Sequence, residues 1–454
     1  MRAWYRKNGK LVLSLCFVFF LSLFALICFG NLVNNSDAMW NYGFSYSIAR
    51  GQVPYRDFTM IIPPAYNFLM SIGLILFSHN NIVFIVEQSF IITLTFYFLY
   101  KIYSDKAFIF LLAMCFPTFI NFAPSYNFFL FFLTVLLIYC DKFEKSDYFI
   151  GMILGFMLLT KYTTGLFLIL PSLIGCYKNK KKLFKRIIGL VIPCLVFLFY
   201  LIFTKSLYNF IDLCFLGLFD FGKDNSEIFT IYFFLSLPLF LYSLYFLIKN
   251  KKNIVAWIVV LAYIIMFPNV SAIHLYIYLL FFSLLIMSLN FGAFAKKVKK
   301  FSILITISLV IIFYILTGTT GLGRLNVHNF NYFYVNSSAV GAFNLANDLY
   351  TEYSKKSNTY YLGEKYIWFQ IINEEDTNYF TILNKGNYGY NGTKKMINRA
   401  KNIHDAYFIV NLDEYDAGIK GKIMSQLDIN IIDFIMENSE KVYSKNNYIV
   451  YYKK

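Results

Sequence analysis

A few ionisable side chains interrupt a chain that is otherwise strongly apolar, and their positions indicate what chemistry it could perform. Lys161 stands between two apolar runs and is flanked by threonines, namely Thr160, Thr163 and Thr164. A charged side chain at the edge of a membrane usually faces a polar cavity and often marks a functional site. A lysine that simply extends to water is the alternative. Lys161 is therefore a candidate for a cationic binding site.

A second group of charged residues follows Pro54, which begins a stretch, PYRDF, that we expect to be extended. The planar guanidinium of Arg56 suits a phosphate group, whereas an ion pair with its neighbour Asp57 is the simpler interpretation. Glu87 falls inside the apolar run that begins at residue 82, where loss of hydration is costly unless the carboxylate faces polar space. It could orient an arginine or a substrate, and a carboxylate at the membrane interface is the alternative.

Four further side chains border the ends of apolar runs. His274 follows the segment PNVSAI, and its neutral ring could donate or accept a hydrogen bond. Tyr126 and Asn127 close the segment NFAPSYN and offer hydroxyl and amide groups to a polar ligand. Arg324 follows the last apolar run and could approach a site from that side. An ordinary structural role is the competing interpretation for each of them.

The segment 31–62 is a candidate functional loop, because long segments between apolar runs often carry function. Ser36 can cap a helix that begins at Asp37. Apolar residues recur at helical spacing from Met39 to Ile48, so we expect an amphipathic helix that lies on the membrane. Gly51 ends this helix. Asp37 would then stand at the start of an interfacial helix, a position that a carboxylate also favours for purely structural reasons.

Composition places these residues in a membrane protein. The chain has 454 residues, of which 58% are hydrophobic, 21% aromatic and only 15% charged, and its mean hydropathy is +0.56. Soluble globular proteins are about 45–50% apolar and about 25% charged. This difference excludes an ordinary soluble enzyme, a disordered protein and a secreted disulfide scaffold. The seven cysteines show no CxxC spacing and resemble small apolar helix residues.

Eleven apolar runs approach the length of about 20 residues that a helix needs to span a bilayer. They cover residues 11–30, 82–102, 107–122, 126–140, 148–160, 163–177, 187–204, 228–248, 254–268, 273–291 and 301–317. The first run is long for a signal peptide and no small-residue cleavage site follows it, so we expect a retained span. The sequence therefore predicts an α-helical polytopic membrane protein with about 11 transmembrane helices.

Whether the run at 63–77 crosses the membrane decides on which side each later loop lies. If it does not cross the membrane, 21 of the Lys and Arg residues in 1–317 lie on the side of the N-terminus and only five on the other side. This agrees with the tendency of positive charge to remain in the cytoplasm, whereas a crossing would place the basic cluster at 178–186 outside. We therefore predict an interfacial or re-entrant helix within an outer loop at 31–81, and a cytoplasmic N-terminus.

Residues 318–454 differ in composition from the rest of the chain. They are richer in Asn, Lys, Tyr and Glu, and their apolar runs shorten to strand length. Alternating helix and strand predicts a small extracytoplasmic α/β domain. We expect its elements at 338–356 (helix), 359–363 (strand), 391–402 (helix), 405–411 (strand), 416–426 (helix), 441–444 (strand) and 447–452 (strand).

Three motifs carry a resemblance to a known family. The first is the outer loop, in which an acidic residue after the first span precedes an aromatic-rich helix, a Gly-x-x-Pro-Tyr-Arg-Asp-Phe turn and a Pro-Pro helix. The second is GFMLLTKYTTGLFLILP at 155–171, and the third is the outward tail with NKGNYGYNGTKKMI at 384–397. Together they resemble GT-C glycosyltransferases, integral membrane enzymes that use polyprenyl-phosphate sugars. Protein O-mannosyltransferases and lipid A aminoarabinose transferases belong to this class, and the tail resembles those of unassigned bacterial members.

The resemblance implies that residues 1–317 form a GT-C-like catalytic module. It would move a sugar from a polyprenyl-phosphate donor to a glycan, lipid or protein acceptor on the outer face of the cell membrane. A cation should stabilise the departing phosphate, for which the candidates are Lys161, Arg56 and Arg324. A carboxylate should take the proton of the acceptor hydroxyl as it attacks the opposite face of the sugar, and family logic assigns this inverting base to Asp37. Candidates for other substrate contacts are Asp57, Glu87, Tyr126, Asn127 and His274.

Several other classes find little support in the sequence. Many GT-C members carry a second acid beside the first, but Ala38 follows Asp37, so a metal-binding acidic pair is absent and the use of a divalent metal stays open. There is no Walker loop, GxGxxG, HExxH or His/Cys metal cluster. The net charge of +16 lies in the short loops, with only +1 in residues 318–454, which argues against nucleic-acid binding.

Two alternatives to the sugar transferase remain. A polysaccharide repeat-unit polymerase also has about a dozen spans, but usually has a large loop between late spans and a short tail. A lipid-linked glycan flippase or other transporter often shows two related halves, and no internal repeat is visible in this sequence.

Overall fold

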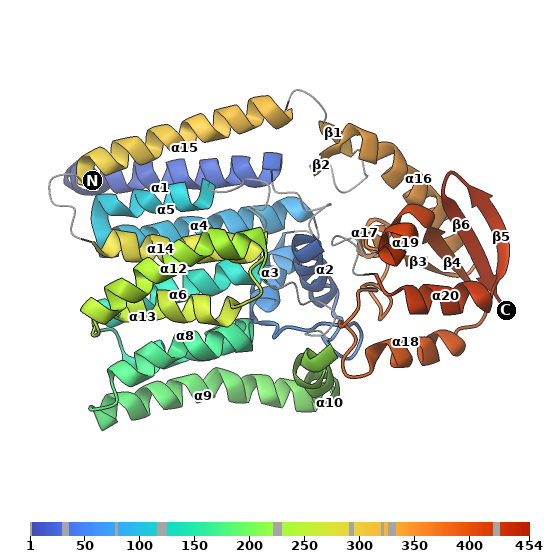
Figure 1. Cartoon of the computed structure of the whole chain (residues 1–454), viewed down its shortest axis with the longest axis horizontal. Helices are drawn as coiled ribbons and strands as arrows, with labels where there is room; N and C mark the ends of the chain where they lie inside the picture. The colour runs from blue at the N-terminus through green and yellow to red at the C-terminus, as the bar shows by residue number, and fades with distance from the viewer. Residues whose placement is uncertain are drawn as a thin grey trace.

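The computed structural model describes residues 2–29, 36–77, 80–115, 125–220, 229–289, 295–318, 322–325, 333–420 and 427–454. In Figure 1 most of the helices up to residue 318 form a bundle of roughly parallel rods, and the helices and strands of the C-terminal part form a body beyond one end of it. The N-terminus lies at the opposite end of the bundle from this C-terminal body.

Each of the eleven predicted spans contains an apolar helix. These helices are α1 (Arg2–Phe29), α4 (Asn81–Tyr103), α5 (Ile109–Cys115), α6 (Tyr126–Lys142), α7 (Asp147–Thr160), α8 (Tyr162–Gly175), α9 (Lys180–Phe203), α12 (Ile231–Lys249), α13 (Ile254–Met266), α14 (Ala272–Ser288) and α15 (Ala295–Gly318). Within the described residues, length and composition allow four segments to cross a membrane: Gly9–Ile27, Asn81–Met114, Lys180–Phe203 and Ile231–Lys249. Several other helices are shorter, so the number of about 11 crossings stays a prediction.

The outside of the bundle is apolar, as a surface in contact with lipid requires. Large side chains such as Val196, Phe199 and Phe203 are exposed on α9, and Phe234 and Leu235 are exposed on α12. A protein that is surrounded by water rarely leaves apolar patches of this extent uncovered. The bundle is therefore a membrane domain.

Polar contacts join the helices at the end of the bundle that holds the N-terminus. Arg186 near the start of α9 donates to Asp141 at 2.6 Å and to Asp147 at 3.0 Å. The same guanidinium donates to the hydroxyl and carbonyl oxygens of Ser172. A buried charge is tolerated only when it is paired and hydrogen-bonded, and these bonds connect α6, α7 and α8 to α9.

Glycines bring α7 and α9 into close contact. A Cβ atom added to Gly151 would lie 2.2 Å from the carbonyl oxygen of Arg186, and one added to Gly189 would lie 2.2 Å from that of Tyr148. Small residues at helix interfaces let two backbones approach in this way. The contact fixes α7, and the C-terminal end of α7 leads directly to Lys161.

Two short helices lie between the bundle and the C-terminal body (Figure 1). The helix predicted after Asp37 is confirmed as α2 (Ser36–Ala49), and Gly51 follows it with φ of +88°. The helix α3 (Ala65–Leu76) has 12 residues, which gives a length of about 18 Å. That is shorter than a hydrocarbon core of about 30 Å, as expected for the predicted interfacial helix at 63–77.

Two local predictions for the outer loop are wrong. The helix α2 is not an amphipathic surface helix, because every residue from Asn41 to Ser47 is buried. The C-terminal body packs against α2 instead, through contacts to Tyr42, Gly43 and Ser47. The stretch at 54–58 is not extended, because Tyr55 has φ of 69° and a bridge between Pro54 and Phe58 closes a turn.

The C-terminal body contains a four-stranded sheet in the order β3-β4-β6-β5. Its strands are β3 (Asn358–Leu362), β4 (Ala406–Asn411), β5 (Glu440–Lys445) and β6 (Tyr448–Lys453), with β3 parallel to β4 and the other pairs antiparallel. Its helices are α16 (Ser337–Ser354), α17 (Tyr366–Ile372), α18 (Gly392–Lys401), α19 (Leu412–Ile419) and α20 (Ile429–Glu437), and β1 (Leu322–Leu325) pairs with β2 (Phe333–Asn336) before them. The four predicted strands are confirmed with small shifts, whereas α17 and α20 were not predicted.

A leucine in place of Gly151 should force α7 and α9 apart. Because even a Cβ atom at this position would lie 2.2 Å from a backbone oxygen, we expect Gly151→Leu to destabilise the bundle by about 3 kcal/mol. The apparent melting temperature of the detergent-solubilised full chain measures this loss. The matched control is Gly175→Leu, since a Cβ atom there would meet nothing within 4 Å. Equal losses in both variants would show that the α7–α9 contact is not the cause.

Candidate functional site

Asp37 occupies the first turn of a helix that other elements hold on both sides. On one side, the ring of Tyr42 stacks on Trp368 of α17 with a centroid distance of 5.5 Å. Next to it, a Cβ atom added to Gly43 would lie 1.9 Å from the side chain of Ile367. A glycine at position 43 therefore lets the C-terminal body pack directly against the backbone of α2.

On its other side, α2 is fixed by hydrogen bonds from buried amides. Asn41 donates its side-chain amide to the carbonyl oxygen of Asp37 at 2.6 Å. Asn67 of α3 in turn donates to the carbonyl oxygen of Asn41 at 2.9 Å and to the hydroxyl of Ser45 at 3.2 Å. These bonds set the position of the helix that carries Asp37.

Lys161 lies in the tight turn between α7 and α8. The turn is close because a Cβ atom added to Gly165 would lie 2.5 Å from the carbonyl oxygen of Met157. The ammonium of Lys161 donates to the side-chain oxygen of Asn127 at 3.0 Å and lies 5.3 Å from the centre of the Tyr126 ring. Two residues at the start of α6 therefore hold the lysine.

Asp37 and Lys161 interact electrostatically without forming a salt bridge in the described structure. Burial raises the pKa of the Asp37 carboxyl above its usual range, and the positive charge of Lys161 opposes that shift. Burial lowers the pKa of the Lys161 ammonium, and the carboxylate opposes that shift in turn. Each charge therefore favours the ionised form of the other in a poorly hydrated place.

His274 lies within the electrostatic range of Lys161 at the start of α14. Its Nδ1 atom accepts a hydrogen bond from the backbone N–H of Ser271 at 3.3 Å, and the Ser271 hydroxyl accepts one from the backbone N–H of His274 at 3.4 Å. This capping box fixes both the ring and the helix start. The histidine thus has the structural role that was the competing interpretation, in addition to its place near the lysine.

The structure thus brings together five of the nine residues predicted from the sequence: Asp37, Tyr126, Asn127, Lys161 and His274. We call them the Asp37–Lys161 cluster. They come from α2, α6, the α7–α8 turn and α14, which are far apart in the chain. A carboxylate that can accept a proton and an ammonium that can balance a growing negative charge are the chemical groups it offers.

Arg56 and Asp57 lie in the Pro54–Phe58 turn rather than in the cluster. The guanidinium of Arg56 donates to Asp57 at 2.8 Å and 3.0 Å, and this pairing lowers the pKa of the Asp57 carboxyl. Asp57 also accepts the backbone N–H of Val53 at 2.7 Å. The ion pair is the simpler of the two interpretations that the sequence left open, and it braces the turn.

Among the described residues, Glu87 contacts α3 rather than the cluster. Glu87 accepts the backbone N–H of Gly73 at 2.9 Å, which joins α3 to α4. The backbone of Arg324 belongs to β1, while its side chain lies outside the described residues. In the part of the chain that the structure describes, no group of three or more His, Cys, Asp or Glu side chains could hold a metal ion.

Sequence reasoning missed the residues that join the outer loop to the C-terminal body. Gln52 accepts from the backbone N–H and the hydroxyl of Thr377 and donates to its carbonyl oxygen at 2.8 Å. The Ser47 hydroxyl lies 2.6 Å from that of Thr377, and Arg50 pairs with Asp376 at 3.1 Å. Nothing in the local pattern of either segment distinguishes these residues from ordinary loop residues.

A second joint connects the C-terminal body to the helices α10 (Leu207–Ile211) and η3 (Asp212–Leu216). Asp212 accepts from Lys395 at 2.6 Å and from the backbone N–H of Tyr390 at 3.3 Å. Gly389 has φ of +80°, and a Cβ atom there would lie 2.4 Å from Asp212. The motif at 384–397 therefore joins the C-terminal body to η3, through the backbone of Tyr390 and the side chain of Lys395.

Comparison with known proteins identifies the fold. No family model matches the chain, and no curated protein matches it in sequence. Two solved structures are similar to it over 98% of both chains: ArnT from Cupriavidus metallidurans bound to undecaprenyl phosphate, with 13% identity and a TM-score of 0.56, and the same protein in the apo state, with 12% identity and a TM-score of 0.52. ArnT is a GT-C protein. The chain therefore has a GT-C-like fold, as the motifs in its sequence indicated.

Removing Gln52 should loosen α2 at a distance from Asp37. Gln52→Ala leaves the buried backbone groups of Thr377 without their side-chain partner, and an unmade buried hydrogen bond costs about 1–3 kcal/mol. We expect faster hydrogen exchange both in α2 and in residues 376–381. The control is Asn438→Ala, since the Asn438 side chain is exposed and donates to the carbonyl oxygen of Phe434, four residues earlier. Unchanged exchange in α2 would mean that the C-terminal body does not hold this helix.

Proposed function

We propose that the chain is a membrane glycosyltransferase of GT-C type. It moves a sugar from a polyprenyl-phosphate donor to an acceptor of the cell envelope. Asp37 acts as the general base, and Lys161 balances the charge of the donor phosphate. The observation that carries the proposal is the Asp37–Lys161 cluster, in which a carboxylate and an ammonium lie near each other without pairing.

The cluster supplies what each step of this transfer requires. The acceptor hydroxyl oxygen attacks C1 of the sugar while its proton passes to the Asp37 carboxylate. The bond between C1 and the phosphate oxygen breaks on the opposite face, and its electron pair leaves with the polyprenyl phosphate. The Lys161 ammonium stabilises the negative charge that grows there. The configuration at C1 is inverted, because the new and the old bond lie on opposite faces.

Three of the cluster residues support these two charges. Asn127 orients the ammonium through its side-chain oxygen, and the ring of Tyr126 lies beside it with its negative face available to a cation. His274, whose ring is fixed by the capping box and which interacts electrostatically with Lys161, is suited to contact the phosphate or the sugar. The roles predicted for Arg56, Asp57, Glu87 and Arg324 have no such support and are left out of the proposal.

The direction of the chain through the membrane follows from charge and position. The start of α9, which carries the basic residues of 180–186, lies at the bundle end that holds the N-terminus, and the C-terminal body lies at the other end (Figure 1). With the positive end in the cytoplasm, α2, the cluster and the C-terminal body lie at the outer face. The donor is a lipid, since ArnT, which has the same fold, was solved with undecaprenyl phosphate bound.

Replacing the proposed base should abolish transfer and leave the fold intact. We expect Asp37→Asn to lower the transfer rate by about 10²- to 10⁴-fold, which is the usual contribution of a general base. The rate is measured in membranes that contain the chain, with a panel of radiolabelled polyprenyl-phosphate sugars and the envelope of the expressing cell as acceptor. Asp416→Asn, at an exposed position of α19, makes the same chemical change as a control. Full activity of Asp37→Asn would show that Asp37 is not the general base.

The pH dependence of transfer should report the interaction between the two charges. A base must be ionised, so activity falls as the pH drops through the pKa of Asp37, which lies above the ordinary value of 3.8. Lys161→Met removes the charge that holds this pKa down, so we expect the acidic limb of the pH–rate profile to move to higher pH. Lys205→Met should leave the limb in place, because Lys161 and not Lys205 is the charge that lowers the pKa of Asp37. A limb that stays fixed or moves to lower pH in Lys161→Met would contradict the assignment.

A further inference from the structure

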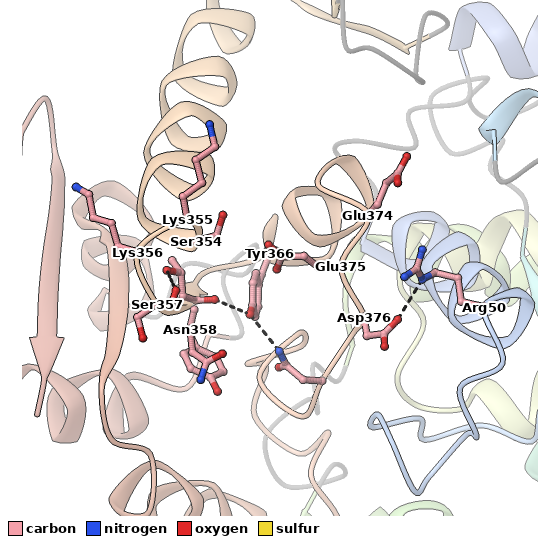
Figure 2. A pocket seen from close by; sticks show the side chains of 13 residues that line it. Arg50, Ser354, Lys355, Lys356, Ser357, Asn358, Tyr366, Glu374, Glu375 and Asp376 are labelled. Carbon is pink, nitrogen blue, oxygen red and sulfur yellow. Dashed lines mark hydrogen bonds and ion pairs between the residues drawn. The ribbon is translucent and has the colours of Figure 1, made fainter.

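A polar groove of about 690 Å³ lies where the end of α2 meets the C-terminal body (Figure 2). Arg50 closes it on the side of α2. The C-terminal end of α16, the start of β3 and the loop after α17 form the other walls. In Figure 2, Lys355 and Asn358 stand on one side of the groove and Asp376 on the side of Arg50.

The floor of the groove is rigid. Tyr366 is buried, and its hydroxyl donates to the carbonyl oxygen of Thr359 at 3.1 Å and accepts from the side-chain amide of Asn378 at 3.1 Å. Glu375 accepts from the hydroxyl of Tyr350. The polar groups of the floor are therefore held in position before any ligand arrives, which reduces the entropy cost of binding.

The rim keeps hydrogen-bonding capacity for a ligand. Lys355 and Asn358 are exposed, and within the described residues their side chains make no hydrogen bond or ion pair. Glu374 and Asp376 are also exposed on the opposite side. The groove thus presents amide, ammonium and carboxylate groups around a preformed hollow.

The balance of charge indicates what kind of ligand fits. Six charged side chains line the groove, three basic and three acidic: Arg50, Lys355, Lys356, Glu374, Glu375 and Asp376. A phosphate would meet the carboxylates, and a cation would meet the basic groups. A docked protein segment normally fills a pocket with an aromatic or aliphatic anchor, and this groove is lined mainly by polar side chains. A neutral ligand rich in hydroxyl groups can use donors and acceptors of both kinds.

The groove lies at a defined distance from the proposed base. Asp37 is at the first turn of α2 and Arg50 follows its last residue, so the two are about 20 Å apart along a helix that rises 1.5 Å per residue. A ligand that reached both places would have to be an extended chain. Because α2 is buried and braced on both sides, this separation is fixed.

We propose that the groove binds the acceptor and that the acceptor is a carbohydrate chain, held several sugar units from the hydroxyl that receives the new sugar. This inference rests on the proposed function and narrows its acceptor to a glycan. The cluster performs the chemistry at one end of α2, and the groove recognises the acceptor carbohydrate at the other end.

Photocrosslinking in membranes of the expressing cell tests the ligand directly. We place p-benzoyl-phenylalanine at position 358, and at Lys441 on β5 as the control, because β5 is the opposite edge of the sheet from β3. We expect a periodate-sensitive carbohydrate adduct at position 358 and none at position 441. A protein adduct at position 358, or no adduct there, overturns the proposal. The readout does not depend on transfer activity, so it stands apart from failure of the proposed function.

A kinetic experiment with the full chain tests the use of the groove as an acceptor site. Asn358→Trp fills the rim, and Lys441→Trp is the control. With size-fractionated envelope glycan as acceptor, we expect Asn358→Trp to raise the half-saturating concentration of long chains about tenfold with the maximal rate unchanged, and to leave short fragments unaffected. A loss of rate that is equal for long and short acceptors would overturn the proposal, because it would show a disturbance of α2 instead. Absence of transfer in the unsubstituted chain would refute the proposed function, and this proposal with it.

Discussion

The proposed transfer depends on holding a carboxylate and an ammonium within electrostatic reach of each other, in a poorly hydrated place, without letting them pair. Opposite charges attract strongly where the dielectric constant is low, and a closed ion pair would leave neither group for a substrate. The protein takes the two charges from separately anchored elements. Asp37 is fixed through α2, and Lys161 is bound to Asn127 at 3.0 Å in the turn after α7. Each charge therefore has its own support, and the described structure holds no salt bridge between them.

This requirement explains why the C-terminal body packs against the membrane domain. A helix of 14 residues is marginal on its own, and α2 contains polar residues such as Asn41, Ser45 and Ser47 that are buried. Hydrogen bonds from α3 and from Thr377 satisfy several of these groups. Without the C-terminal body, one face of α2 would meet lipid or water and its position would be poorly defined. The body is therefore part of the framework that positions the proposed base.

The sequence predicts those features that depend on the pattern of residues close together in the chain. The apolar spans and the asymmetry of Lys and Arg are patterns of this kind, and rare charges such as Asp37 and Lys161 are conspicuous within them. The contact between α2 and the C-terminal body is not local, because Ser47 and Thr377 are 330 residues apart. The apolar spacing of α2 resembles that of a lipid-facing helix, although its partner is α17. The segment YIWFQII of α17 has only seven residues, too few for its periodicity to predict a helix.

The same reasoning explains how a fold can persist at 13% identity. The membrane domain requires apolar outer faces, which many residues provide, and a few close backbone contacts, which only small residues such as Gly151 and Gly165 allow. The proposed chemistry requires two charges on well-held elements. The groove at Arg50 lies at the opposite end of α2 and shares no side chain with the cluster. If the two proposals hold, residues that select the acceptor can change without moving the Asp37 carboxylate, because α2 is held along its length by α3 and by the C-terminal body.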